Sequence, residues 1–217
     1  YIREAIVNYI ALLGWNPGDN REKMSMEEMI DAFSLGGLHT APSIFDEPKL
    51  RWLSGEYVRA MSAEQFAEAA LPFLKASKAY GKFDTAALLR IVQPRVEILS
   101  EIPEKLDFLA GFSKIDEALY FNKKMKSDAD VARQVLPAAE DVLRGLPSFA
   151  NADIYAALVA LAQERGMKNG QVLWCVRIAL TAKESTPGGA SEMAELLGRE
   201  ESLARLAKAQ AWLRGEE

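Results

Sequence analysis

An aromatic residue, an arginine and a polar turn lie close together near the C-terminal end of the sequence. Trp174 and Arg177 are three residues apart, so a helix would place both side chains on one face. The corner Thr186–Gly189 follows, and proline before two glycines is typical of a rigid turn with exposed backbone groups. An aromatic ring, a guanidinium and free hydroxyl and backbone groups are the partners that an unpaired nucleotide base uses.

The helix that must position these side chains has the pattern of a core helix. Residues 170–181 are apolar on nearly all helical faces, with Val172 and Val176 at helical spacing, which predicts a buried helix. A guanidinium in such a helix is costly unless an anion or a hydrogen-bond acceptor meets it. Two interpretations of Arg177 stay open: it contacts a bound base, or it pairs with an internal carboxylate. Trp174 likewise either stacks on a base or fills the core.

The composition of the 217 residues excludes several kinds of site. Cys175 and His39 are the only cysteine and the only histidine, so a disulfide has no second thiol and a zinc site or Ser-His-Asp triad has too few groups. No glycine-rich phosphate loop or nucleophile elbow is present, and we predict no catalytic residue and no metal site. The hydrophobic fraction of 49% suffices for a packed core.

Charge and hydropathy limit the partners and the compartment. The net charge is −5, whereas nucleic-acid-binding domains are usually basic, so a surface for RNA would have to be local. No apolar run approaches the roughly 20 residues of a membrane span, and we expect no membrane partner. The single cysteine fits a reducing compartment, and we expect a cytoplasmic location.

Apolar residues recur at helical spacing along the whole chain, and alternation is absent, which predicts an all-α fold of short helices. Helix ends are predicted where capping residues, prolines and glycines interrupt that spacing. These are starts at Ser25 (with Glu28), Ser62 (with Gln65), Ser127 (with Asp130) and Asn151, a break at Pro94 and an end at Gly198.

Five blocks of the sequence carry a resemblance that covers essentially the whole chain. They are, in order, Glu4–Trp15; Pro42–Asp46 with Lys49–Leu53 and Tyr57; Gln93–Arg95; Pro103–Lys105; and Gly170–Arg177 with Thr186 and Pro187. Together they resemble bacterial glutamyl-tRNA synthetases, a family of class I aminoacyl-tRNA synthetases. The resemblance implies the C-terminal piece of such a synthetase, with the catalytic domain lying before Tyr1.

The resemblance also implies an organisation and a partner. It predicts a helical stem-contact domain over residues 1–60 and a helical anticodon-binding domain in two parts, 61–107 and 108–217. The expected partner is tRNA-Glu, with no DNA, and the chain is expected to be a monomer. The parent enzyme would attach glutamate to this tRNA with ATP and Mg²⁺. This piece is expected to hold no cofactor and to be inactive alone.

Arg95 is the first binding residue that the resemblance implies, because the family places an arginine after this proline against the last anticodon base. A guanidinium offers only hydrogen-bond donors. The pairing edge of cytosine offers acceptors at O2 and N3, whereas that of guanine carries donors at N1 and N2. The glutamate anticodon ends in C and the glutamine anticodon ends in G, so Arg95 would favour tRNA-Glu. The alternative is a surface arginine after a helix break.

The resemblance assigns the other anticodon pockets to positions that match Arg177, Thr186 and Pro187. Trp174 stands where the family often has a smaller or polar residue, and we rank it lower as an anticodon-binding residue. Gly189 stands where relatives commonly carry a larger apolar residue, so the shape of the pocket is expected to differ.

A second group of residues matches the stem-contact helix of the family. Lys49, Arg51 and Trp52 are expected to meet the backbone of the tRNA body. The alternative is a solvated helix face with a core tryptophan.

Two further functions are weighed against an anticodon-reading fragment of glutamate–tRNA ligase. One is an α-helical scaffold that binds protein partners, which the acidic composition favours mildly. The other keeps the family but relaxes its specificity, so that tRNA-Gln is also accepted. Binding of tRNA that weakens with salt would separate the leading hypothesis from the scaffold.

Overall fold

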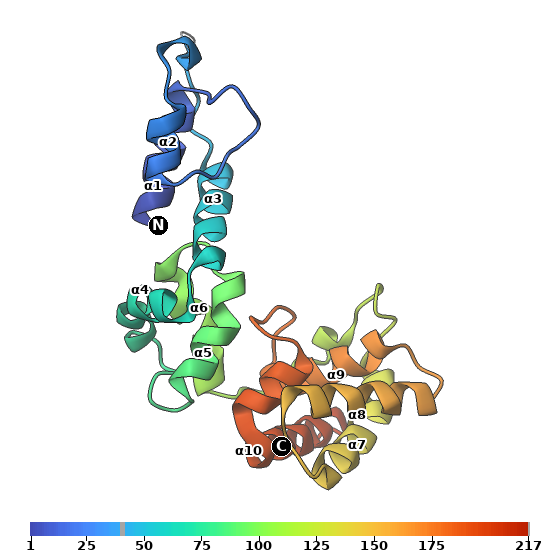
Figure 1. Cartoon of the computed structure of the whole chain (residues 1–217). Coiled ribbons are helices and arrows are strands. Elements are labelled where there is room, and N and C mark those ends of the chain that lie inside the picture. The colour runs from blue at the N-terminus through green and yellow to red at the C-terminus, as the bar shows by residue number, and fades with distance from the viewer. Residues whose placement is uncertain (40–41, 217) are drawn as a thin grey trace. The chain divides into compact units, whose positions relative to one another are not determined.

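The computed structural model describes residues 1–39 and 42–216; Thr40, Ala41 and Glu217 lie outside the described residues. Within those two ranges every regular element is a helix, which confirms the all-α prediction, and extended pairing is limited to the isolated bridges Trp15–Leu38 and Asn122–Ser127. The chain folds as two compact units (Figure 1). Unit 1 contains residues 1–77 and 92–104, and unit 2 contains residues 78–91 and 105–216. The predicted three-part division stays a prediction.

Unit 1 is built of helices whose starts are fixed by side-chain caps. Ser25 and Ser62 each form the predicted capping box, with Glu28 and Gln65. Asp46 caps a further helix by accepting a hydrogen bond from the Lys49 backbone at 3.1 Å. The elements are α1 (Arg3–Gly14), α2 (Met26–Ala32), the 3₁₀ turn η1 (Leu35–Gly37), α3 (Glu47–Ala60), α4 (Ala63–Lys75), and the turns η2 (Gln93–Arg95) and η3 (Leu99–Glu101).

Unit 2 is centred on α9 (Asn169–Thr181), which packs against α7 (Ala129–Gly145), α8 (Asn151–Glu164) and α10 (Ala190–Leu213) (Figure 1). Most of α9 is buried, as its sequence pattern predicts. The unit also holds the turns η4 (Asp107–Ala110) and η5 (Glu117–Tyr120), and α5 (Thr85–Val92) and α6 (Ile102–Leu106) lie where the chain passes between the units.

Two predicted interruptions are confirmed. α5 ends at Val92, and the 3₁₀ turn that contains Pro94 follows it directly. α10 is broken at Gly198, whose φ of 77° lies in the left-handed region that a glycine adopts without strain.

Two predicted helix starts are wrong in detail. α7 is capped by Asp128, whose side chain accepts from the Val131 backbone at 2.9 Å, and not by Ser127. The Ser127 hydroxyl lies 3.2 Å from the Cys175 sulfur instead. Asn151 is the first residue of α8 and its side chain makes no capping hydrogen bond. For Ser127 a tertiary neighbour competes with local capping for the hydroxyl, whereas the Asn151 side-chain oxygen is buried and has no hydrogen-bond partner among the described residues.

Candidate nucleic-acid interface

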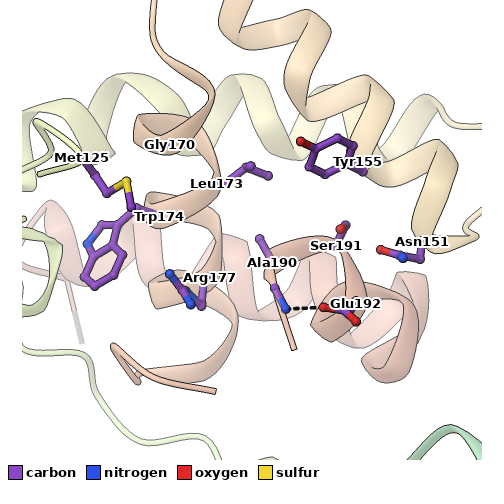
Figure 2. A pocket seen from close by; sticks show the side chains of 11 residues that line it. Met125, Asn151, Tyr155, Gly170, Leu173, Trp174, Arg177, Ala190, Ser191 and Glu192 are labelled. Carbon is purple, nitrogen blue, oxygen red and sulfur yellow. Dashed lines mark hydrogen bonds between the residues drawn. The ribbon is translucent and has the colours of Figure 1, made fainter. Parts of the chain in front are cut away.

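A pocket of about 370 Å³ opens in unit 2 beside α9 (Figure 2). This volume is within the range of about 300–1,000 Å³ that is usual for small-molecule sites. α9 supplies one wall, and the first turns of α8 and α10 supply the opposite one. The lining residues are Met125, Asn151, Tyr155, Gly170, Leu173, Trp174, Arg177, Gly189, Ala190, Ser191 and Glu192.

Arg177 enters this pocket as a cation without a carboxylate. No ion pair within 4.0 Å holds its guanidinium among the described residues, so the interpretation of an internal salt bridge is wrong. Its Nε is buried with no hydrogen-bond partner. Burial lowers the pKa of the Arg177 guanidinium, since little around it compensates the charge. A partly desolvated donor of this kind favours any acceptor or anion that enters the pocket.

The ring of Trp174 packs against the Arg177 guanidinium. The Arg177 Cζ lies 5.0 Å from the centroid of the Trp174 ring, within cation–π range. The tryptophan is 6% exposed, and its Nε1 donates to the Leu119 carbonyl at 3.2 Å. Of the two interpretations that the sequence left open, this burial agrees with a core residue that forms the pocket wall.

The opposite wall adds acceptors that sequence reasoning missed. The Asn151 Oδ1 is buried without a hydrogen-bond partner in the described residues, while its backbone N–H donates to Glu195 Oε1 at 2.8 Å. Glu192 accepts from the Gly189 N–H at 2.7 Å (Figure 2). Tyr155 is 49% exposed at the same wall. The pocket therefore sets the donor-only Arg177 across from the Glu192 carboxylate, an acceptor, and this combination suits the mixed edge of a nucleotide base.

Thr186 and Pro187 shape the segment that leads into the pocket but are not among its lining residues. The Thr186 hydroxyl donates to the Gly188 carbonyl at 2.6 Å, and Pro187 is buried. A Cβ at Gly188 would lie 2.6 Å from Met193 Cε and 2.9 Å from Glu192 Cβ, so glycine is needed for this close approach. The Thr186 hydrogen bond and the close packing at Gly188 thus fix the conformation of the corner. Its last residue, Gly189, lines the pocket.

Arg95 belongs to unit 1, whereas the residues that line the pocket belong to unit 2. It is exposed at the end of η2. The turn is held in place because the Gln93 side-chain amide donates to the Val58 and Met61 carbonyls, at 3.1 and 2.9 Å, and Val96 is fully buried.

The residues predicted to meet the tRNA body lie on α3 of unit 1, and the two cations are in ion pairs. The Lys49 Nζ lies 2.7 Å from Glu22. Arg51 contacts Glu97 at 3.1 Å and Glu101 at 2.7 Å. Trp52 is 41% exposed and is therefore not a core residue.

Residues 1–39 and 42–216 contain no candidate metal cluster and no candidate membrane span. No group of three or more His, Cys, Asp or Glu side chains there could hold a metal ion. No helix in those ranges is both long and apolar enough to cross a membrane.

Two family models match the chain. Residues 65–210 match the family model of an anticodon binding domain, and residues 1–52 match that of the catalytic domain of class I tRNA synthetases for E and Q. The start of the chain was expected to belong to a stem-contact domain that follows the catalytic domain, whereas this match includes it in the catalytic family model.

The chain is similar over nearly its whole length to named ligases. It is 42% identical to glutamate–tRNA ligases of Clostridium botulinum strain Hall and Clostridium tetani strain Massachusetts, over 95% of this chain and 42% of each relative. A crystal structure of a glutamate tRNA ligase from Elizabethkingia meningosepticum, in complex with its amino acid, superposes with a TM-score of 0.80 at 27% identity. That match covers 98% of this chain and 42% of the solved one. The chain thus spans less than half the length of these relatives.

Proposed function

The chain belongs to the anticodon-binding domain family, as part of the glutamate–tRNA ligase group, and from this premise we propose that it binds tRNA-Glu and reads its anticodon. The observation that carries the proposal is Arg177. It is a partly buried cation, seated on Trp174, without a carboxylate partner and at the wall of a pocket large enough for a nucleotide base. A group so placed binds an RNA acceptor without first leaving an ion pair.

We assign the last anticodon base to Arg95 in unit 1. Its guanidinium offers donors to O2 and N3 of cytosine, and the same donors would face N1 and N2 of guanine unfavourably. The support is positional, because η2 is anchored by Gln93 to α3 and presents Arg95 at the surface. Lys49, Arg51 and Trp52 on α3 are proposed to contact the tRNA body, and the ion pairs of Lys49 and Arg51 would keep the contribution of these two cations small.

The chemistry of the longer relatives is proposed only for a longer enzyme. Such an enzyme would activate glutamate with ATP and Mg²⁺ and esterify it to tRNA-Glu. The described residues of this chain contain no group of three or more His, Cys, Asp or Glu side chains that could hold a metal ion. The 217-residue chain is proposed to bind tRNA without charging it.

Titration of the chain with two anticodon stem–loop RNAs, one ending in C and one in G, tests the proposal. We expect tighter binding of the C-ending RNA, and affinity that falls as salt rises. Arg95→Gln should narrow the ratio of the two affinities, because one arginine–base contact contributes about 1–3 kcal/mol of discrimination. Arg3→Gln, which removes an exposed arginine of the same unit, is the matched control and should leave the ratio unchanged.

Two results would contradict this assignment. Equal affinity ratios for the wild type and Arg95→Gln would remove the role of Arg95. The absence of salt-dependent RNA binding by the wild type would instead favour a scaffold that binds protein partners.

A further inference from the structure

A short hairpin rich in lysine lies directly beside the pocket. Residues 121–127, with the sequence Phe-Asn-Lys-Lys-Met-Lys-Ser, form this basic hairpin. Asn122 and Ser127 exchange backbone hydrogen bonds of 2.8 and 3.1 Å at its base. The Asn122 side chain accepts from the Met125 backbone at 3.0 Å, which closes the turn from inside. The hairpin therefore has a defined backbone conformation of its own.

The basic hairpin is attached to α9, the helix that carries Arg177. Met125 of the hairpin lines the pocket and packs against Gly170 (Figure 2). The contact is close, because a Cβ added at Gly170 would lie 2.6 Å from the Met125 sulfur. The Gln171 side-chain amide donates to the Lys126 carbonyl at 2.8 Å. These contacts place the tip of the hairpin at the rim of the pocket.

The lysines of the basic hairpin form a positive surface on an acidic chain. Lys123, Lys124 and Lys126 are exposed, and none of them has an ion-pair partner among the described residues. The net charge of the whole chain is −5, so this concentration of positive charge is local. Phe121, at the start of the hairpin, is 66% exposed. Lysines beside an exposed aromatic ring are the composition of surfaces that bind single-stranded RNA.

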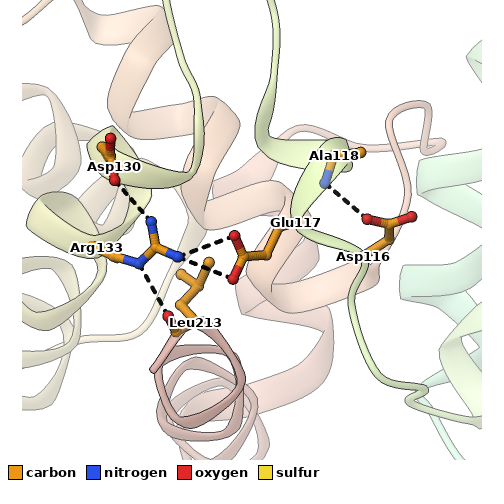
Figure 3. A network of polar contacts seen from close by, with 6 residues as sticks. All are labelled: Asp116, Glu117, Ala118, Asp130, Arg133 and Leu213. Atoms are coloured by element: carbon orange, nitrogen blue, oxygen red, sulfur yellow. Dashed lines mark hydrogen bonds and ion pairs between the residues drawn. The ribbon is translucent and has the colours of Figure 1, made fainter. Parts of the chain in front are cut away.

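The acidic residues that flank the hairpin in sequence are engaged elsewhere (Figure 3). Arg133 pairs with Glu117 at 3.0 Å and with Asp130 at 2.8 Å, and it also donates to the Leu213 carbonyl at 3.0 Å. Asp128 caps α7. Because these carboxylates are occupied, they do not neutralise the lysines through ion pairs.

We propose that the basic hairpin binds the phosphate backbone of the RNA next to the base that occupies the Arg177 pocket. This inference rests on the proposed function and adds a second binding element to it. Lysine ammonium groups are mobile point charges that suit phosphates and carry little sequence information. The hairpin therefore supplies affinity for any anticodon loop, while the pocket beside it supplies the discrimination between bases.

The test compares two triple variants of the whole chain. Lys123→Gln, Lys124→Gln and Lys126→Gln are combined in the first. The control combines Lys78→Gln, Lys114→Gln and Lys208→Gln, three exposed lysines of the same unit that do not line the pocket. Dissociation constants for the C-ending and G-ending stem–loops are measured from about 50 to about 200 mM salt, a range over which phosphate contacts are strongly screened.

We expect the hairpin variant to flatten the salt dependence. Each phosphate contact to a single strand contributes about 0.7 to the slope of log K against log salt, so three lysines contribute about 2. Binding at low salt should weaken by roughly 10- to 100-fold, in line with losing several charge contacts. The ratio between the two RNAs should stay unchanged. Replacing the same lysines by arginine should keep the wild-type slope, and unchanged thermal unfolding would exclude misfolding.

Three outcomes would overturn the inference. If both triple variants keep the wild-type slope, the hairpin does not hold the backbone, while the proposed function stands. If the hairpin variant changes the ratio between the RNAs and not the slope, the hairpin reads a base and not the backbone. If the wild type binds neither RNA, the proposed function fails, and this inference fails with it.

Discussion

Helix α3 carries Arg51 next to Trp52, and helix α9 carries Arg177 three residues after Trp174, yet these two arginines differ in what surrounds them. Arg51 on α3 is held by Glu97 and Glu101, and the hydrogen bond to Glu101 raises the pKa of its guanidinium. Arg177 on α9 has no carboxylate, and burial lowers the pKa of its guanidinium. The same residue type is thus an ion-pair partner in unit 1 and an unsatisfied donor in unit 2. The tertiary surroundings, and not the residue type, decide which arginine is ready for a ligand.

The largest expected effect is on the pH dependence of the free energy of unfolding. It tests whether water is excluded from the buried side of α9, as the buried Arg177 Nε indicates. Burial raises the pKa of the Cys175 thiol, two residues before Arg177, to about 11. The unfolded chain ionises this thiol near its ordinary pKa of 9.0, so the unfolded state loses its proton first as the pH rises. The free energy of unfolding should therefore fall between these two pKa values, by roughly 2–3 kcal/mol.

Urea unfolding at a series of alkaline pH values measures this fall. The variant Cys175→Ala should lose the part of this fall that comes from the Cys175 thiol. It should keep the part that comes from Tyr120, whose hydroxyl is buried and whose pKa is also raised by burial. Identical pH profiles for the two proteins would mean that water reaches α9, and the contrast with α3 would lose its basis.

Replacing Arg177 should weaken RNA binding without lowering the stability of the fold. Arg177→Gln is expected to weaken binding of the anticodon stem–loop by about 1–3 kcal/mol, roughly 5- to 150-fold. Its melting temperature should stay the same or rise, because a partly buried charge without a partner is lost. Arg165→Gln removes an exposed arginine from the same unit and serves as the control for net charge. A clear drop in melting temperature with unchanged RNA affinity would assign Arg177 to the core instead.

The smallest effect is expected at the paired arginine. Arg51→Gln should lower the free energy of unfolding by less than about 1 kcal/mol, since its side chain is 33% exposed and such ion pairs contribute little. Its affinity for full-length tRNA-Glu should change by only about 3-fold or less, because the two carboxylates compete with phosphate for the guanidinium. A loss above about 10-fold would mean that Arg51 leaves its ion pairs for RNA, and the contrast between the two helices would not hold.

Local signals in the sequence were enough to place many helix ends. The capping boxes at Ser25 and Ser62 and the break at Gly198 depend on residues a few positions apart, and all three are confirmed. Ser127 fails as a cap because Asp128 takes that role and Cys175, far along the chain, lies against its hydroxyl. These helix ends were predictable because the residues that fix them are close in the sequence, whereas burial or a distant partner decided the side chains of Asn151 and Ser127.

The surroundings of the candidate site depend on contacts that no local pattern contains. The Arg51 carboxylates come from residues 97 and 101, and nothing in the sequence marks Arg177 as lacking such partners. Asn151 was expected to cap α8, whereas its side-chain oxygen is buried at the pocket. The roles of Arg95, Arg177, Thr186 and Pro187 in reading the anticodon stay predictions, and the resemblance to the synthetase family was the signal that identified them.

The seating of the hairpin on α9 has a consequence for the length of the RNA loop. Two contacts attach the hairpin to the first turn of α9, the helix that carries Arg177. Met125 packs on Gly170, and the Gln171 side-chain amide donates to the Lys126 carbonyl. The separation between the lysines and the base pocket is therefore set by one rigid element and not by a flexible linker. An anticodon loop with one inserted nucleotide, bound in the proposed way, could satisfy the hairpin or the pocket but not both. The length of the anticodon loop would then be checked by the spacing of two protein surfaces, without any contact to the extra nucleotide.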